Sequence, residues 1–190
     1  LFKALGFQNL LKDFSGFRRY GALLEEGGKK KVSQLPADIP VLPWGKGIDI
    51  KGEIVSLVPV ISGTAPFYAC SGGVVATAHG VYRLGHEEPQ EGLQALASAG
   101  AVAAEDTKAL WEAGLGREDI RFFEPALAAY LLDPTRAAYP LSYLSDAFGL
   151  PTMFLEEIND PVQKCAGKGR LLADLCRPMT EKKKKNRVAA

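Results

Sequence analysis

Two carboxylates of the first β-rich run, Asp49 and Glu53, are of a residue type that could take part in metal-assisted chemistry. Hard divalent cations are held by several oxygen ligands, and two acids on one face of a strand can supply a pair of them. An extended strand would place Asp49 and Glu53 on one face, but with their Cβ atoms roughly 13 Å apart. That separation is too wide for one shared ion.

The cysteines and histidines offer no second metal site. Cys70, Cys165 and Cys176 are odd in number and follow no CxxC or Cys/His spacing, so the sequence predicts neither a disulfide framework nor a zinc site. His79 and His86 have no acid or cysteine at ligand spacing and are expected to be exposed loop residues. Free cysteines fit a reducing, cytoplasmic setting.

Composition and charge limit the classes of protein that the chain can be. With 190 residues, of which 47% are hydrophobic and 24% charged, it resembles one globular domain with a sizeable core. A net charge of +1 argues against a surface built mainly to grip a nucleic acid backbone, so any DNA contact is expected to be weak. No apolar run approaches the roughly 20 residues that span a bilayer, and no signal peptide is evident. We expect a soluble, cytoplasmic protein without a membrane contact.

The pattern of residues divides the chain into three parts. Residues 1–14 have apolar residues at helical spacing and predict a short amphipathic helix that needs a surface to pack on. A lysine- and proline-containing linker follows, so that residues 1–43 form a connector and the folded domain spans 44–179. Residues 180–190 form a basic tail, predicted to be a solvated helix end, with a weak phosphate contact as the alternative.

Within the domain, β-rich runs come first and helices follow. Strands are expected over 47–53, 56–61, 66–70, 74–77 and 101–104, the first three antiparallel to one another, with Pro59 marking an edge or bulged strand. Helices are expected over 91–98, 106–113, 124–132, 140–148 and 160–176. This order predicts an α/β fold with a mixed, mostly antiparallel sheet flanked by helices.

The most distinctive stretch joins an apolar helix to an abrupt Asp-Pro stop, and reads Phe-Phe-Glu-Pro-Ala-Leu-Ala-Ala-Tyr-Leu-Leu-Asp-Pro-Thr-Arg from Phe122 to Arg136. It resembles the segment of bacterial family A DNA polymerases, the DNA polymerase I family, that follows the second motif of their 3′–5′ exonuclease domain. The opening residues resemble the helical connector before that domain. The resemblance covers Leu1 to about Leu150, more weakly to Met179, and implies a ribonuclease-H-like exonuclease fold.

In active members of that family, carboxylates from three places hold two divalent metals. At the first place this chain has Asp49-Ile50-Lys51 with Glu53 beyond, and a lysine at the second ligand position repels a metal. At the second place Leu110 occupies the ligand position and Asp106 a non-ligand position, where a helix start also favours an acid. The resemblance therefore implies that these two ligand sets are incomplete.

The third place is a Tyr-x-x-x-Asp on a later helix. Its ligand falls near Lys168 and its tyrosine is missing, which leaves Asp174 as the rescue candidate. Three incomplete places imply a domain that holds no metal, unless Mg²⁺ or Mn²⁺ is bound in an unorthodox site.

The resemblance thus implies an exonuclease-like domain of a DNA polymerase I, involved in DNA replication or repair. It further implies that the domain has lost its catalytic acids and serves as a scaffold beside the polymerase domain of the same or a companion chain. Two alternatives stay open. One is an active 3′–5′ proofreading exonuclease that uses Asp49, Glu53, Asp106 and Asp174 with Mg²⁺ or Mn²⁺. The other is a non-catalytic module whose opening helix docks on another protein.

Overall fold

The computed structural model describes residues 38–45, 47–64, 67–85, 89–132, 134–151 and 155–188, with residues 63, 64, 67, 68, 132, 156 and 180–188 described by their backbone alone. The expected opening helix over 1–14, most of the expected linker and His86 lie outside these residues.

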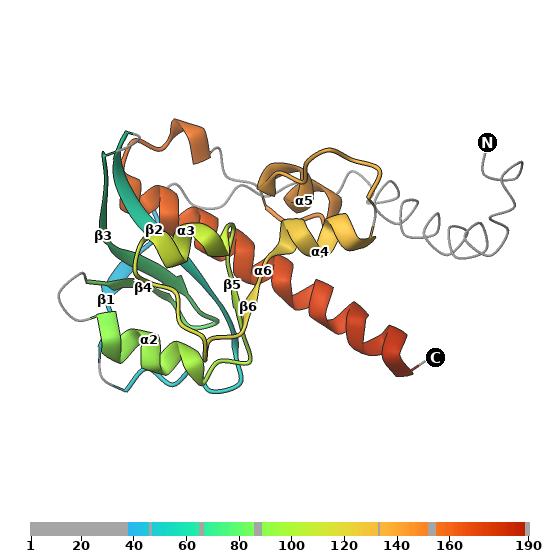
Figure 1. The fold of residues 1–190 in the computed structure, drawn as a ribbon, viewed down its shortest axis with the longest axis horizontal. Coiled ribbons are helices and arrows are strands. Elements are labelled where there is room, and N and C mark those ends of the chain that lie inside the picture. The colour runs from blue at the N-terminus through green and yellow to red at the C-terminus, as the bar shows by residue number, and fades with distance from the viewer. Residues whose placement is uncertain are drawn as a thin grey trace, which may run out of the picture.

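A single mixed sheet of six strands forms the centre of the described part of the chain (Figure 1). Its spatial order is β1-β4-β3-β2-β5-β6, and its strands are β1 (Val41–Pro43), β2 (Ile54–Thr64), β3 (Phe67–Ala76), β4 (Val81–Leu84), β5 (Ala101–Ala103) and β6 (Phe122–Phe123). β3 is antiparallel to both β2 and β4, whereas the pairs β1–β4, β2–β5 and β5–β6 are parallel.

The expectation of a mostly antiparallel sheet is therefore wrong, because three of the five neighbouring pairs among the described strands are parallel. The direction of β5 and β6 follows from the helical connections that lead to them. Helix α2 (Pro89–Ala97) leads from β4 to β5 and helix α3 (Thr107–Glu112) leads from β5 to β6. A helical crossover of this kind returns the chain in the same direction, which produces parallel neighbours.

Strand β2 is the central strand and is covered on both faces. Val55 and Leu57 point to one face, while Ser56 and Val58 point to the other, and all four are buried. Pro59 causes a bulge, since the β2–β3 register shifts between Pro59 and Ile61. Of the two expectations for this strand, the bulge is confirmed and the edge position is wrong.

Some expected strands and boundaries differ from the structure. Residues 47–53 form turns rather than a strand, because Gly47 and Gly52 adopt positive φ values of 96° and 72°. The runs at 66–70 and 74–77 belong to one strand, β3, and the sequence did not predict β4. The sheet begins at Val41, ahead of the first expected strand, because β1 pairs with β4.

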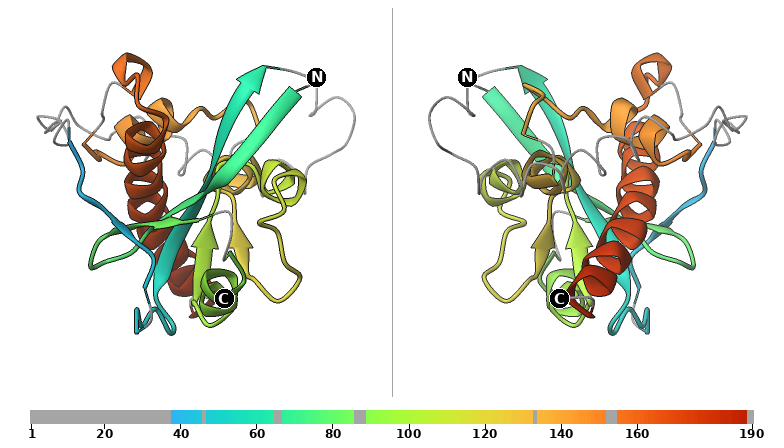
Figure 2. Two further views of the ribbon diagram at one scale, coloured as in Figure 1. Left: turned by 90° about the vertical axis from the view of Figure 1, so that its left-hand side faces the viewer. Right: turned by 90° about the vertical axis from the view of Figure 1, so that its right-hand side faces the viewer.

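Helices cover both faces of the sheet and give three layers (Figure 2). One face packs on α2 and α3 around Leu93, Leu96 and Leu110. The other face packs on α6 (Pro161–Val188), which runs past Pro178 and through most of the expected tail.

Two short helices, α4 (Pro125–Leu132) and α5 (Leu141–Ala147), pack on the later part of α6 rather than on the sheet (Figure 1). Their shared core includes Ala129, Leu144 and Leu175. A short 3₁₀ turn, η1 (Leu155–Glu157), precedes α6.

Candidate functional site

The order in which strands are added to the sheet reverses at β2. The carboxyl ends of β2 and β5 are therefore the expected place for a ligand. After β2 the chain adds β3 and β4 on one side, and then crosses to add β5 and β6 on the other. Open α/β sheets bind ligands at such a switch point, outside the carboxyl ends of the strands. A cavity of about 500 Å³ lies there, hereafter the β2–β5 cleft, lined by Val58, Pro59, Ile61, Glu105, Asp106, Ala109, Pro161, Lys164, Cys165 and Lys168.

Three elements build the β2–β5 cleft. The later half of β2 supplies an apolar wall, of which Val58 and Pro59 are part. The turn between β5 and α3 supplies Glu105 and Asp106. The first half of α6 supplies the third side, where residues 161, 164, 165 and 168 recur at the spacing of one helix face.

Both acids of the cleft already have partners. Lys168 Nζ lies 2.6 Å from Glu105 Oε2, with the two side chains 28% and 46% exposed. Asp106 is the N-cap of α3, and its Oδ1 accepts a hydrogen bond of 3.2 Å from the backbone N–H of Ala109. The charged side chains of the cleft are thus two carboxylates, each with a contact to another residue, and two lysines. Such a set offers a metal ion few oxygen ligands.

A second acid, Glu124, also accepts hydrogen bonds at the amino end of α3. Glu124 Oε1 accepts a hydrogen bond of 2.8 Å from the backbone N–H of Thr107, and it also accepts one from the Thr107 hydroxyl. Asp106 and Glu124 therefore occupy backbone donors at this helix start that could otherwise bind an anion. Both acids have a structural role in the described fold.

The cysteine in the cleft is a poor nucleophile. Cys165 is half-buried, and its Sγ lies 3.5 Å from the carbonyl oxygen of Pro59. Burial raises the pKa of the Cys165 thiol, and the nearby Lys168 only partly opposes that rise. Because the thiolate is the reactive form, the protonated Cys165 serves as a small packing residue.

Asp49 and Glu53 lie at the opposite edge of the sheet from the cleft. Both precede β2, and the carbonyl oxygen of Glu53 accepts a hydrogen bond of 2.7 Å from the N–H of Gly100, which precedes β5. Asp106 follows β5, which is parallel to β2. The sheet therefore separates Asp49 and Glu53 from Asp106, and the structure does not bring these candidates together.

Each of these two acids also has local contacts. Asp49 is exposed, and its Oδ1 accepts a hydrogen bond of 3.0 Å from the backbone N–H of Lys51. Glu53 Oε1 lies 3.1 Å from His79 Nε2, while Glu53 Oε2 is buried without a hydrogen-bond partner. His79 is exposed, as expected, with 72% of its side chain accessible.

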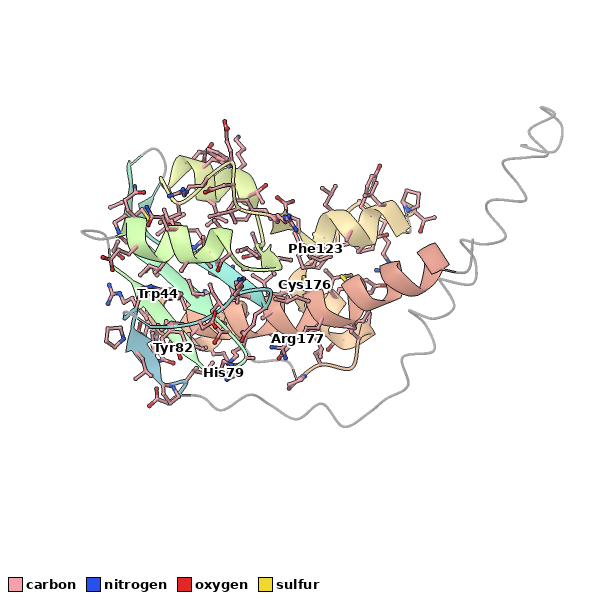
Figure 3. All side chains as sticks on the ribbon, turned by 90° about the horizontal axis from the view of Figure 1, so that it is seen from below. Trp44, His79, Tyr82, Phe123, Cys176 and Arg177 are labelled. Carbon is pink, nitrogen blue, oxygen red and sulfur yellow. The ribbon has the colours of Figure 1, made fainter. Side chains whose placement is uncertain are left out.

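Asp174 is set apart from the other candidates. It lies on α6 six residues beyond Lys168, about 9 Å along the helix axis, and does not line the cleft. Its Oδ1 lies 3.7 Å from Arg177 Nη1. Figure 3 labels Arg177 on α6, whereas His79, the partner of Glu53, belongs to the turn between β3 and β4.

Sequence reasoning identified some members of the cleft and missed others. Asp106 and Lys168 were both considered from the resemblance, and both line the cleft, while Leu110 is fully buried in the core on the other face. Glu105 and Lys164 were not considered. The one signal that could have indicated Glu105 is its position directly after a short buried strand, where parallel strands present side chains to a ligand.

Within the described residues, no group of three or more histidine, cysteine, aspartate or glutamate side chains is placed to hold a metal ion. Nor does this part of the chain include a helix with the length and apolarity needed to cross a membrane. Comparison of the sequence with models of protein families and with curated proteins finds no match.

Proposed function

We propose that the chain is an exonuclease-like domain of a DNA polymerase I-type protein in DNA replication or repair, that it has lost 3′–5′ exonuclease activity, and that it acts as a scaffold beside a polymerase domain. The observation that carries the proposal is the composition of the β2–β5 cleft. Its two acids are held by Lys168 and by the start of α3, and its β2 wall is apolar.

The arrangement of elements supports a ribonuclease-H-like exonuclease fold. In the active nucleases that the sequence resembles, ligands come from a first strand, a strand-to-helix junction and a later helix. Here the cleft is lined by a central strand, β2, by the β5–α3 junction and by the helix α6. Residues of the second and third places, Asp106 and Lys168, therefore meet at the cleft, whereas the first place, Asp49 to Glu53, lies at the opposite edge of the sheet.

The residues that line the cleft, together with Leu110, support the loss of activity. Val58 and Pro59 of β2 carry no ligand atoms in their side chains, and Leu110 is buried away from the cleft. Lys168 adds a cation where the resemblance places a ligand. Two divalent cations would need several oxygen ligands, and the cleft offers only two carboxylates, one of which is paired with Lys168.

A scaffold role fits the remaining features. A net charge of +1 favours weak DNA contact through this chain alone, so that tight binding would depend on the polymerase domain of the same or a companion chain. The resemblance at residues 122–136 supplies the link to that protein family.

The test is removal of the 3′-terminal nucleotide from labelled single-stranded DNA with Mg²⁺ or Mn²⁺ in excess. We expect no cleavage by the chain above the level of a buffer control, with an active 3′–5′ exonuclease as the positive control. Asp106→Ala changes the cleft, and Asp49→Ala changes an exposed acid at the opposite edge of the sheet.

If cleavage is observed, the two variants show whether it depends on the cleft or on the acids at the opposite edge of the sheet. Cleavage that Asp106→Ala abolishes and Asp49→Ala leaves intact would refute the inactive domain and place a live site in the cleft. Cleavage that Asp49→Ala abolishes would favour the alternative of an active exonuclease in which Asp49 acts with Glu53, Asp106 and Asp174. The scaffold role predicts in addition that the chain binds a family A polymerase domain, measurable by calorimetry.

A further inference from the structure

Helix α4 has an apolar face that the described residues leave uncovered. Its eight residues include no charged side chain. Ala129 packs in the core shared with α5 and α6, while Leu127, Tyr130 and Leu131 are 54%, 49% and 67% exposed. A helix that is apolar all round is normally buried on every side.

The three exposed side chains form one patch. Residues 127, 130 and 131 are spaced i, i+3 and i+4, which places them next to one another on a helix. They are half of the six large hydrophobic side chains that are exposed among the described residues; the other three are Leu42, Ile61 and Trp111. A contiguous apolar patch of this kind marks an interaction surface.

We propose that residues 1–14 of the same chain form an amphipathic helix that docks on this α4 face. The sequence places Phe7, Leu10, Leu11 and Phe14 at i, i+3, i+4 and i+7, which makes an apolar stripe along a helix. Such a helix of about four turns is marginal in water without a surface to cover its stripe. The inference is independent of the proposed function.

The connecting chain is long enough to bring the two surfaces together. Ile39 is fixed at the early part of α6, because its N–H and C=O form two hydrogen bonds of 3.0 Å with the Gln163 side chain. Along α6, Gln163 is about 18 Å from Leu175, where α4 packs. A flexible coil of 23 residues, the number from 15 to 37, would have an end-to-end distance of roughly 26 Å, which is more than that span.

The length of this link also indicates which segment covers the α4 patch. A short tether gives an effective concentration in the millimolar range, so docking within one chain is favoured over docking between two copies in dilute solution. The tether therefore favours the chain's own opening segment over a second copy at low protein concentration.

The test is hydrogen exchange of the full chain, followed by mass spectrometry on peptides that cover residues 1–14. We expect their amides to exchange at least about ten-fold more slowly than in the same peptide alone, because docking stabilises the helix. Leu131→Glu should abolish this slowing by placing a charge in the patch. Leu42→Glu, the same change at an exposed leucine of β1, should leave it unchanged.

Three results would overturn the proposal. The first is exchange of residues 1–14 at the rate of the free peptide. The second is slowing that Leu131→Glu and Leu42→Glu leave equal. The third is slowing that grows with protein concentration, which would mean that a second copy covers the patch. If Leu131→Glu fails to fold, Phe7→Glu changes the opposite partner and must give the same loss.

Discussion

Gly100 lies where β5 begins against the start of β2, and replacing it with alanine should weaken this junction. An added Cβ at Gly100 would lie 2.5 Å from the carbonyl oxygen of Gly52 and 3.3 Å from that of Glu53. The nearer group is backbone and cannot rotate away like a side chain. The turn that contains Gly52 must therefore shift.

Two short backbone hydrogen bonds cross this junction, beside a longer one of 3.4 Å from Ala101 to the Glu53 carbonyl. Gly100 donates to the Glu53 carbonyl at 2.7 Å, and Gly52 donates to the Ser98 carbonyl at 3.0 Å. Each net backbone hydrogen bond contributes about 0.5–1.5 kcal/mol, so losing both costs about 1–3 kcal/mol. Alanine also lowers the conformational entropy of the unfolded chain, which stabilises the folded state by about 0.4–1 kcal/mol. We expect Gly100→Ala to lower the free energy of unfolding by about 1–2 kcal/mol.

Urea unfolding followed by circular dichroism measures this change as a lower midpoint with an unchanged slope. Gly85→Ala is the matched control, because no heavy atom lies within 4 Å of the Cβ position there and its φ is not in the left-handed region. That variant should be neutral or more stable by up to about 1 kcal/mol. If Gly100→Ala unfolds at the same urea concentration as Gly85→Ala, the close approach at the Gly52 carbonyl does not constrain the fold.

Three further predictions concern the core, the cleft and the dependence of stability on pH. Leu172→Ala should cost about 2–5 kcal/mol in urea unfolding, because Leu172 is buried between α6 and the sheet, whereas Leu42→Ala at an exposed position should change stability by less than about 0.5 kcal/mol. Asp106→Ala should cost about 0.5–2 kcal/mol through loss of the α3 cap, and Asp106→Asn should keep most of that stability; an Asn variant as unstable as the Ala variant would contradict the capping role. Burial raises the pKa of the Cys176 thiol from 9.0 to about 11, so the folded chain keeps a proton that the unfolded chain loses. The free energy of unfolding should therefore be unaffected by this thiol below pH 9.0 and fall as the pH rises towards about 11, and the difference between the chain and Cys176→Ala in pH-dependent thermal unfolding isolates that effect.

Elements with local sequence signals were predicted well. The apolar run before Asp133-Pro134 predicted α4, and the structure places it at Pro125–Leu132. The helix expected at 140–148 corresponds to α5 at Leu141–Ala147. These predictions depend on helical spacing and on a proline that ends a helix, both of which are read from adjacent residues.

Elements that depend on distant partners were predicted poorly. The run at 47–53 has the composition of a strand, but Gly47 and Gly52 turn it. The strands β1 and β6 are only three and two residues long, and each is defined by pairing with β4 or β5. So short a run carries too few residues for a period to be recognised.

The sequence by itself determined the α/β class and the order of the main helices, because both follow from residue type and short-range spacing. Only the tertiary structure decided where the candidate site lies. The ion pair of Lys168 with Glu105 joins residues 63 positions apart, and the parallel alignment of β2 with β5 sends Glu53 and Asp106 to opposite edges of the sheet. Strand direction and pairing are set by long-range contacts, so no local pattern could have separated those acids or identified the cleft that contains Glu105.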